Sequence, residues 1–101
     1  MGNPHLAGLR PTHPGELLRE DILPALGLTR VEVARRLGIS RALLYAILSE
    51  KAPVTPAMAL RLARLLGGSP ESWLNVQRTY DLRTLEVEMA EELAAIRPVA
   101  A

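Results

Sequence analysis

The sequence predicts an all-α fold, and three observations support that prediction. Leu, Ala, Val and Ile must fill the core, because the 101 residues include no Phe, one Trp and two Tyr. Apolar residues recur at steps of three and four along most of the chain, and no strand-length stretch alternates between apolar and polar residues. Residues typical of helix starts, several followed by proline, divide this pattern into segments. A chain of this length accommodates one small domain.

Composition narrows the classes of function. The chain has no Cys, no signal peptide and no apolar stretch long enough to cross a membrane, so we expect a cytoplasmic protein without membrane contact. Its two histidines, His5 and His13, lack the spacing of a catalytic pair or a metal site. We therefore expect no enzyme activity, metal, cofactor or small-molecule substrate. Basic residues predominate across residues 29–64 and acidic ones across 69–101, which suggests two different partners.

The first segments are an arm and a helix. Residues 1–11 contain two prolines and two glycines without periodicity, which predicts a flexible N-terminal arm. A helix should begin near Pro14, since proline suits the first helical position. Its inward side would carry Leu18, Ile22 and Leu26, and Pro24 should end or kink it.

Two short helices follow. Thr29 with Glu32 three positions later forms a capping-box pattern, and the buried residues of this helix would be Val33, Ala34 and Leu37. Gly38 stands where a left-handed residue ends a helix, and Ser40 can cap the next helix. The third helix would turn Leu44 and Ile47 inward.

Two further helices are marked by an N-cap residue followed by proline, at Thr55-Pro56 and Ser69-Pro70. Gly67-Gly68 separates them. Beyond Tyr80 a narrow apolar stripe continues at helical spacing, through Leu82, Leu85, Met89, Leu93 and Ile96. The pattern leaves open whether the fifth helix runs on through this stripe or breaks near Asp81.

The stretch from Thr29 to Ser49 has the requirements of a helix-turn-helix. Such a unit needs a small residue where its helices cross, a turn residue that tolerates positive φ, and apolar residues that lock the pair. Ala34 and Gly38 meet the first two requirements. Three residues supply the lock: Val33, Leu44 and Ile47. A plain helical hairpin with a glycine turn is the alternative interpretation.

A helix-turn-helix inserts its second helix into the major groove of DNA. The candidates for base contact lie along that helix: Ser40, Arg41, Ala42 and Tyr45. Arg41 can donate two hydrogen bonds to guanine, and Ala42 can meet a thymine methyl. Tyr45 could instead pack on the fourth helix. Three residues suit phosphate contacts at the two flanks: Thr29, Arg30 and Lys51.

One short module contacts few bases, so we expect a homodimer on an inverted repeat. The candidate interface is the aromatic stripe of the fifth helix: Trp73, Leu74, Val76, Gln77 and Tyr80. Aromatic residues are enriched at such interfaces, although Trp73 could equally cap the small core.

These residues resemble the XRE/Cro helix-turn-helix family, and more closely the HigA-type antitoxins. The resemblance rests on HPGELLRE (13–20), LGLTRVEVARRLGISR (26–41) and TPAMALRLARLLGGSPESWLNVQRTYDL (55–82). It implies a five-helix, lambda-repressor-like domain over residues 12–81, with its dimerising helix included and a C-terminal helical extension over 82–101. Two residues depart from the pattern. Leu43 replaces a residue that is often polar or basic, and Ser72 replaces an aromatic residue.

The resemblance also implies a function. The chain would be the antitoxin of a type II toxin–antitoxin module, binding double-stranded operator DNA as an autorepressor and neutralising a HigB-type mRNA endonuclease toxin. A stand-alone XRE-family regulator without a toxin is the main alternative, and an adaptor that binds no DNA is a third. The toxin could contact the arm, the first helix or the acidic C-terminal helix.

Overall fold

The computed structural model describes residues 11–99, and the regular secondary structure within that range is entirely helical. The helical elements in chain order are α1 (Pro14–Leu17), the π-helical turn η2 (Leu18–Ile22), α2 (Leu23–Leu26), α3 (Arg30–Leu37), α4 (Arg41–Leu48), α5 (Pro56–Leu66), α6 (Pro70–Glu88) and α7 (Ala90–Ala95). The prediction of an all-α fold is confirmed. The predicted N-terminal arm lies outside the described residues except for Pro11.

The first predicted helix is one continuous helical run, made of α1, η2 and α2. It continues past Pro24 and ends at Gly27, whose φ of 70° is left-handed. Pro24 is tolerated because it follows the π-helical turn and stands in the first turn of α2, where a missing N–H costs little. The wider turn also rotates the residues after it, so Leu23 is buried and Leu26 is exposed. The inward position expected for Leu26 is therefore wrong.

The predicted N-caps are present at four helices. Thr29 Oγ1 accepts a hydrogen bond from Glu32 N at 3.1 Å, and Ser40 Oγ accepts one from Leu43 N at 3.0 Å. The side chains of Thr55 and Ser69 cap α5 and α6 in the same way. Each cap satisfies an amide that has no partner inside its helix, so these helices begin where the sequence predicts.

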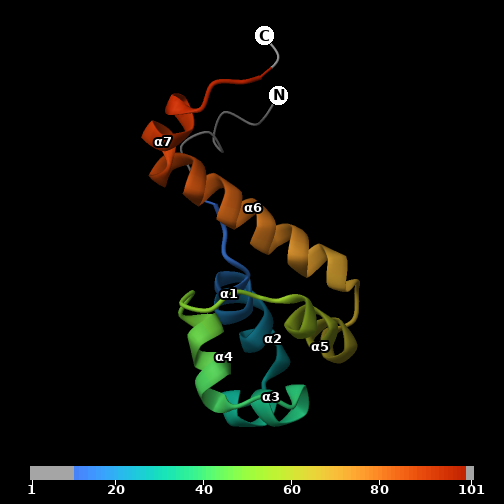
Figure 1. Cartoon of the computed structure of the whole chain (residues 1–101). Helices are drawn as coiled ribbons and strands as arrows, with labels where there is room; N and C mark the ends of the chain where they lie inside the picture. The colour runs from blue at the N-terminus through green and yellow to red at the C-terminus, as the bar shows by residue number, and fades with distance from the viewer. Residues whose placement is uncertain (1–10, 100–101) are drawn as a thin grey trace.

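The core lies among α1 to α5 and is built mainly of aliphatic side chains. The buried apolar residues are Leu18, Leu23, Val33, Ala34, Leu37, Leu44, Ile47, Leu48, Val54, Met58, Ala59 and Leu62. All five residues predicted to face inward from α3 and α4 are among them. Figure 1 shows α3 at the end of this body that lies farthest from α7, and α4 running from there along one side toward α1.

Helix α6 gives the molecule its elongated shape, 53 × 28 × 22 Å. It starts beside α5, crosses α1 and continues beyond the body toward α7 (Figure 1). The helix passes through Asp81 without a break and ends at Glu88, which settles the question that the sequence left open. The expected boundary between residues 81 and 82 thus falls inside a helix. Within residues 11–99, no helix is long and apolar enough to cross a membrane.

Candidate nucleic-acid interface

Helices α3 and α4 meet in the arrangement that a helix-turn-helix requires. Ala34 is 2% exposed where the two helices approach each other. Gly38 ends α3 with a φ of 72°. Its amide donates to Arg35 O, and the Ile39 amide donates to Ala34 O, both at 3.1 Å. These bonds satisfy carbonyls that would be free at the helix end, so the turn has a defined geometry.

Arg61 of α5 fastens this turn from outside. Its guanidinium donates to Leu37 O at 2.7 Å and more weakly to Gly38 O at 3.4 Å. A cation at the C-terminal end of a helix is favoured by the helix dipole. The sequence suggests only that Arg61 covers apolar surface, because nothing in the local spacing connects residue 61 with residues 37 and 38.

A second arginine holds the C-terminal end of α4. Arg19, in the π-helical turn, donates to Leu48 O at 2.5 Å and to the Glu50 carboxylate at 3.3 Å. Glu50 itself has a φ of 66° and closes the end of α4. Gly15 lies so close by that a β-carbon there would stand 1.9 Å from Ile47 O. Other elements therefore hold both the turn that leads into α4 and the C-terminal end of α4.

All seven predicted DNA contacts are exposed: Thr29, Arg30, Ser40, Arg41, Ala42, Tyr45 and Lys51. Six of them lie on α3, on α4 or on their N-caps, and Lys51 lies in the loop after α4. Tyr45 is 46% exposed and does not pack into the core. The Arg30 guanidinium instead lies over its ring, 5.5 Å from the centroid, which is within the range of a cation–π contact. This contact joins α3 to α4 on their exposed side.

Ion pairs divide the basic residues of this surface into two groups. Arg35 and Arg36 both bind the carboxylate of Glu32, and their hydrogen bonds lower the pKa of that carboxyl to about 2. Arg30, Arg41 and Lys51 form no ion pair with any residue from 11 to 99. These three side chains are available to neutralise phosphates. The same part of the chain holds no cluster of side chains suited to a metal ion.

Comparison with known proteins places this geometry in a family. Residues 18–74 match the Helix-turn-helix family. Virulence-associated protein I of Dichelobacter nodosus is 43% identical, over 73% of this chain and 68% of its own length. Antitoxin HigA-1 of Vibrio cholerae serotype O1 is 31% identical, over 89% of this chain and 85% of its own length. The structure of antitoxin GraA in complex with its operator superposes with a TM-score of 0.84 at 38% identity, covering 100% of this chain and 99% of that one.

The chain belongs to the HigA-type antitoxin family of helix-turn-helix proteins. This is a family of DNA-binding proteins and not of enzymes. The two departures from the HigA-type pattern both lie at the surface. Leu43 is 40% exposed on α4, and the Ser72 hydroxyl donates to Ser69 O at 2.8 Å in the first turn of α6.

The stripe predicted as the HigA-type dimer interface lies largely against its own body. Gln77 is 6% exposed, accepts a hydrogen bond from Val54 N at 2.8 Å and donates to Asp81 at 3.0 Å. Trp73 and Leu74 pack on the core, and Val76 is half-buried. Much of this helix face is therefore used within the chain, while apolar side chains farther along α6 are exposed.

A buried histidine connects this stripe to α1. His13 Nδ1 accepts a hydrogen bond from Gly15 N at 2.9 Å and so caps α1. The ring also meets Tyr80 of α6 edge to face, with centroids 4.8 Å apart. Burial lowers the pKa of His13, partly opposed by the negative charges of Glu50 and Asp81. The sequence gives this residue no role beyond its place just before Pro14.

Proposed function

We propose that this chain is the antitoxin of a type II toxin–antitoxin module, a DNA-binding autorepressor that also neutralises a HigB-type mRNA endonuclease toxin. The observation that carries the DNA-binding part is the exposed N-terminal part of α4, which follows the turn held by Arg61 and lies among Arg30, Arg41 and Lys51, cations that form no ion pair with residues 11–99. Antitoxin GraA, to which this chain is similar along its whole length, has been solved in complex with its operator. Such a protein would act in the cytoplasm, where bacterial DNA lies.

The proposed contacts divide into base readers and phosphate binders. Arg41 stands at the first residue of α4 and can form two hydrogen bonds with a guanine edge. Ser40 precedes it as the N-cap of α4, and Ala42 and Tyr45 follow it along the helix. The three phosphate contacts lie on either side: Thr29, Arg30 and Lys51. Phosphate contacts fix the orientation of the protein on DNA, and base contacts provide its sequence preference.

A homodimer would place two α4 helices in successive major grooves of an inverted repeat, with half-sites about 34–36 Å apart. We propose that the dimer forms along α6, near the predicted residues Trp73, Leu74, Val76, Gln77 and Tyr80. Since much of that stripe packs on its own body, the partner would also cover Leu82 and Leu85, which are 48% and 45% exposed.

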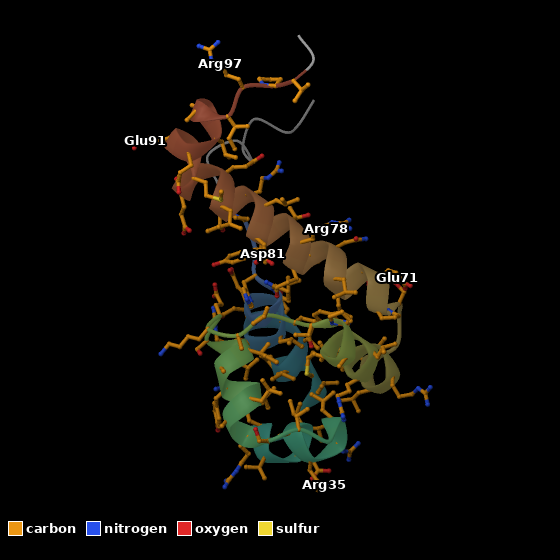
Figure 2. The ribbon with its side chains drawn as sticks, viewed as in Figure 1. Arg35, Glu71, Arg78, Asp81, Glu91 and Arg97 are labelled. Atoms are coloured by element: carbon orange, nitrogen blue, oxygen red, sulfur yellow. The ribbon has the colours of Figure 1, made fainter. Side chains whose placement is uncertain are left out.

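The toxin would bind at the other end of the molecule. The end of α6 and α7 carry four exposed carboxylates: Glu86, Glu88, Glu91 and Glu92. In Figure 2, Glu91 and Arg97 lie at the end opposite Arg35. A nuclease that binds RNA presents a basic surface, which this acidic end complements. Toxin contact there would leave the DNA-facing unit uncovered.

The DNA-binding part is tested with Arg41→Ala on the DNA upstream of the gene. Loss of a bidentate guanine contact should weaken specific binding by about 5- to 150-fold, with little change on unrelated DNA. Quantitative mobility shifts on both DNAs measure this. Arg97→Ala removes the same charge at the far end and should have no effect. Equal weakening on both DNAs by Arg41→Ala would assign this residue to phosphate instead.

The toxin part is tested by co-expression with the product of the neighbouring gene. We expect the two proteins to co-purify and the antitoxin to relieve growth arrest by its partner. A charge-reversed variant, Glu91→Lys with Glu92→Lys, should weaken the complex and retain operator binding. A neighbouring product that neither binds nor arrests growth would favour the stand-alone regulator.

A further inference from the structure

The outer face of α4 is unusually poor in hydrogen-bonding groups. Leu44, Ile47 and Leu48 face the core. Ala42 and Ala46, one turn apart, lie on the opposite side of the helix, because residues four apart share a face. Leu43 and Tyr45 flank them, 40% and 46% exposed. The centre of the surface that faces the major groove therefore consists of methyl and methylene groups.

The polar side chains near this face lie at its edges, and several already have partners. The Ser40 hydroxyl oxygen accepts a hydrogen bond from Leu43 N. Ser49 Oγ lies 3.3 Å from Ala46 O and donates to it. The ring of Tyr45 lies beneath the Arg30 guanidinium. Of the side chains on α4 itself, Arg41 is thus the long polar group that is free to read a base by hydrogen bonds.

The major groove offers such a surface one apolar partner, the 5-methyl group of thymine. Other base edges present donors or acceptors, which would lose water beneath an apolar helix face without gaining a hydrogen bond. Helix α4 cannot easily tilt to bring different side chains forward, because Arg61 holds the turn that precedes it and Arg19 holds its C-terminal end. The apolar centre must therefore meet whatever bases lie beneath it.

We propose that this protein reads its operator largely through pyrimidine 5-methyl groups, with Ala42, Leu43 and Ala46 as specificity-determining residues and Arg41 as the main hydrogen-bonding reader. The inference rests on the proposed DNA-binding function and names the chemistry that is recognised. A 5-methylcytosine presents the same methyl group in the major groove. Methylation of cytosine at these positions thus strengthens binding.

The test uses the full-length protein and the upstream DNA protected in a footprint. Each thymine of one half-site is replaced in turn by deoxyuridine, which removes only the 5-methyl group. We expect about a three- to fourfold loss of affinity at each thymine beneath Ala42, Leu43 or Ala46, and no loss at thymines outside the footprint. Replacing the same T·A pair by 5-methylcytosine·G and by C·G should show the methylated pair bound more tightly.

A matched protein variant assigns the contact. Ala46→Ser adds a single hydroxyl group, which places a polar atom on this apolar face, and should shrink the thymine-to-deoxyuridine ratio at one position only. Because this ratio is measured within each variant, a change in folding does not affect it. Equal affinity for thymine and deoxyuridine DNA throughout the half-site would overturn the inference and leave the proposed function standing. Failure to bind the upstream DNA at all would overturn both.

Discussion

Gly15 shows how the absence of a side chain at one position allows α1 to approach α4 closely. The backbone of α1 approaches the C-terminal end of α4 so closely that any β-carbon at residue 15 would overlap Ile47 O. The Gly15 amide also donates the hydrogen bond to His13 Nδ1 that caps α1. Close approach and capping together locate the end of α4 relative to α1.

We therefore expect Gly15→Ala to lower the free energy of unfolding by about 3 kcal/mol or more, the upper end of the range for overpacking. Urea unfolding measures this loss. Gly27→Ala is the matched control, because a β-carbon added there would meet no atom of residues 11–99 within 4 Å beyond its chain neighbours, and only the φ of 70° resists alanine. That change should cost about 1 kcal/mol and leave operator affinity intact. Equal losses in the two variants would contradict a steric role for Gly15.

Single residues also show what the sequence can and cannot predict. Thr29, Ser40, Thr55 and Ser69 cap amides three positions away, so a local pattern is enough to find them. Arg61 binds Leu37 across 24 positions and Gln77 binds Val54 across 23. Bonds of that kind depend on how helices pack, which no short pattern encodes.

At the scale of elements, α6 is a structural member of the domain as well as a candidate contact surface. The amphipathic stripe from Trp73 to Tyr80 predicts one apolar face but does not say what covers it. In the structure His13 and the core cover most of it. The π-helical turn is a second case, since its extra residue changes which later residues face inward, so that Leu23 is buried and Leu26 is exposed. The spacing of apolar residues gives no sign of it.

The contact between α1 and α6 should make stability depend on pH. The pKa of folded His13 lies below its ordinary value of 6.5, so near and below that pH the unfolded chain binds more protons than the folded one. Stability from this residue is complete above pH 6.5 and declines as the pH falls below it. Protonation also removes the Nδ1 lone pair that caps α1.

Urea unfolding between pH 7.5 and 5.5 measures this effect. His13→Asn keeps a capping acceptor and cannot titrate, so its stability should change less over that interval. His5 is present in both the unmodified protein and the variant, so the difference between their two pH profiles reports on His13 alone. Identical pH profiles would show that His13 is not the titrating group.

The whole molecule separates a DNA-facing body from an extension that projects beyond it (Figure 1). The basic and acidic halves of the sequence predict this division, and the positions of Arg35 and Glu91 follow it (Figure 2). What the sequence cannot predict is that both parts share α6. The exposed apolar side chains at the end of α6, on α7 and at the C-cap of α7 are Leu82, Leu85, Val87, Leu93 and Ile96.

If the dimer forms along α6, Leu82→Asp with Leu85→Asp should convert it to monomer while the body stays folded. Burying two carboxylates in an apolar interface costs several kcal/mol, enough to raise the dissociation constant at least about 100-fold. Sedimentation at micromolar concentration measures the mass. Arg83→Asp is the control, because this exposed residue is one position from Leu82 and two from Leu85 and so does not share their helix face. A dimer that persists in the double variant would place the interface elsewhere.

The bond between Gln77 and Val54 N also has a consequence for synthesis. The amide of Val54, in the loop that follows α4, finds its hydrogen-bond partner only in Gln77, which is synthesised later. His13 likewise gains its aromatic contact only when Tyr80 has been synthesised. A nascent chain that has exposed only residues 1–66 has all of α3, α4 and α5 but not the helix that closes over them. Full repressor activity should therefore appear only after α6 has left the ribosome, so an interrupted translation product would not occupy the operator.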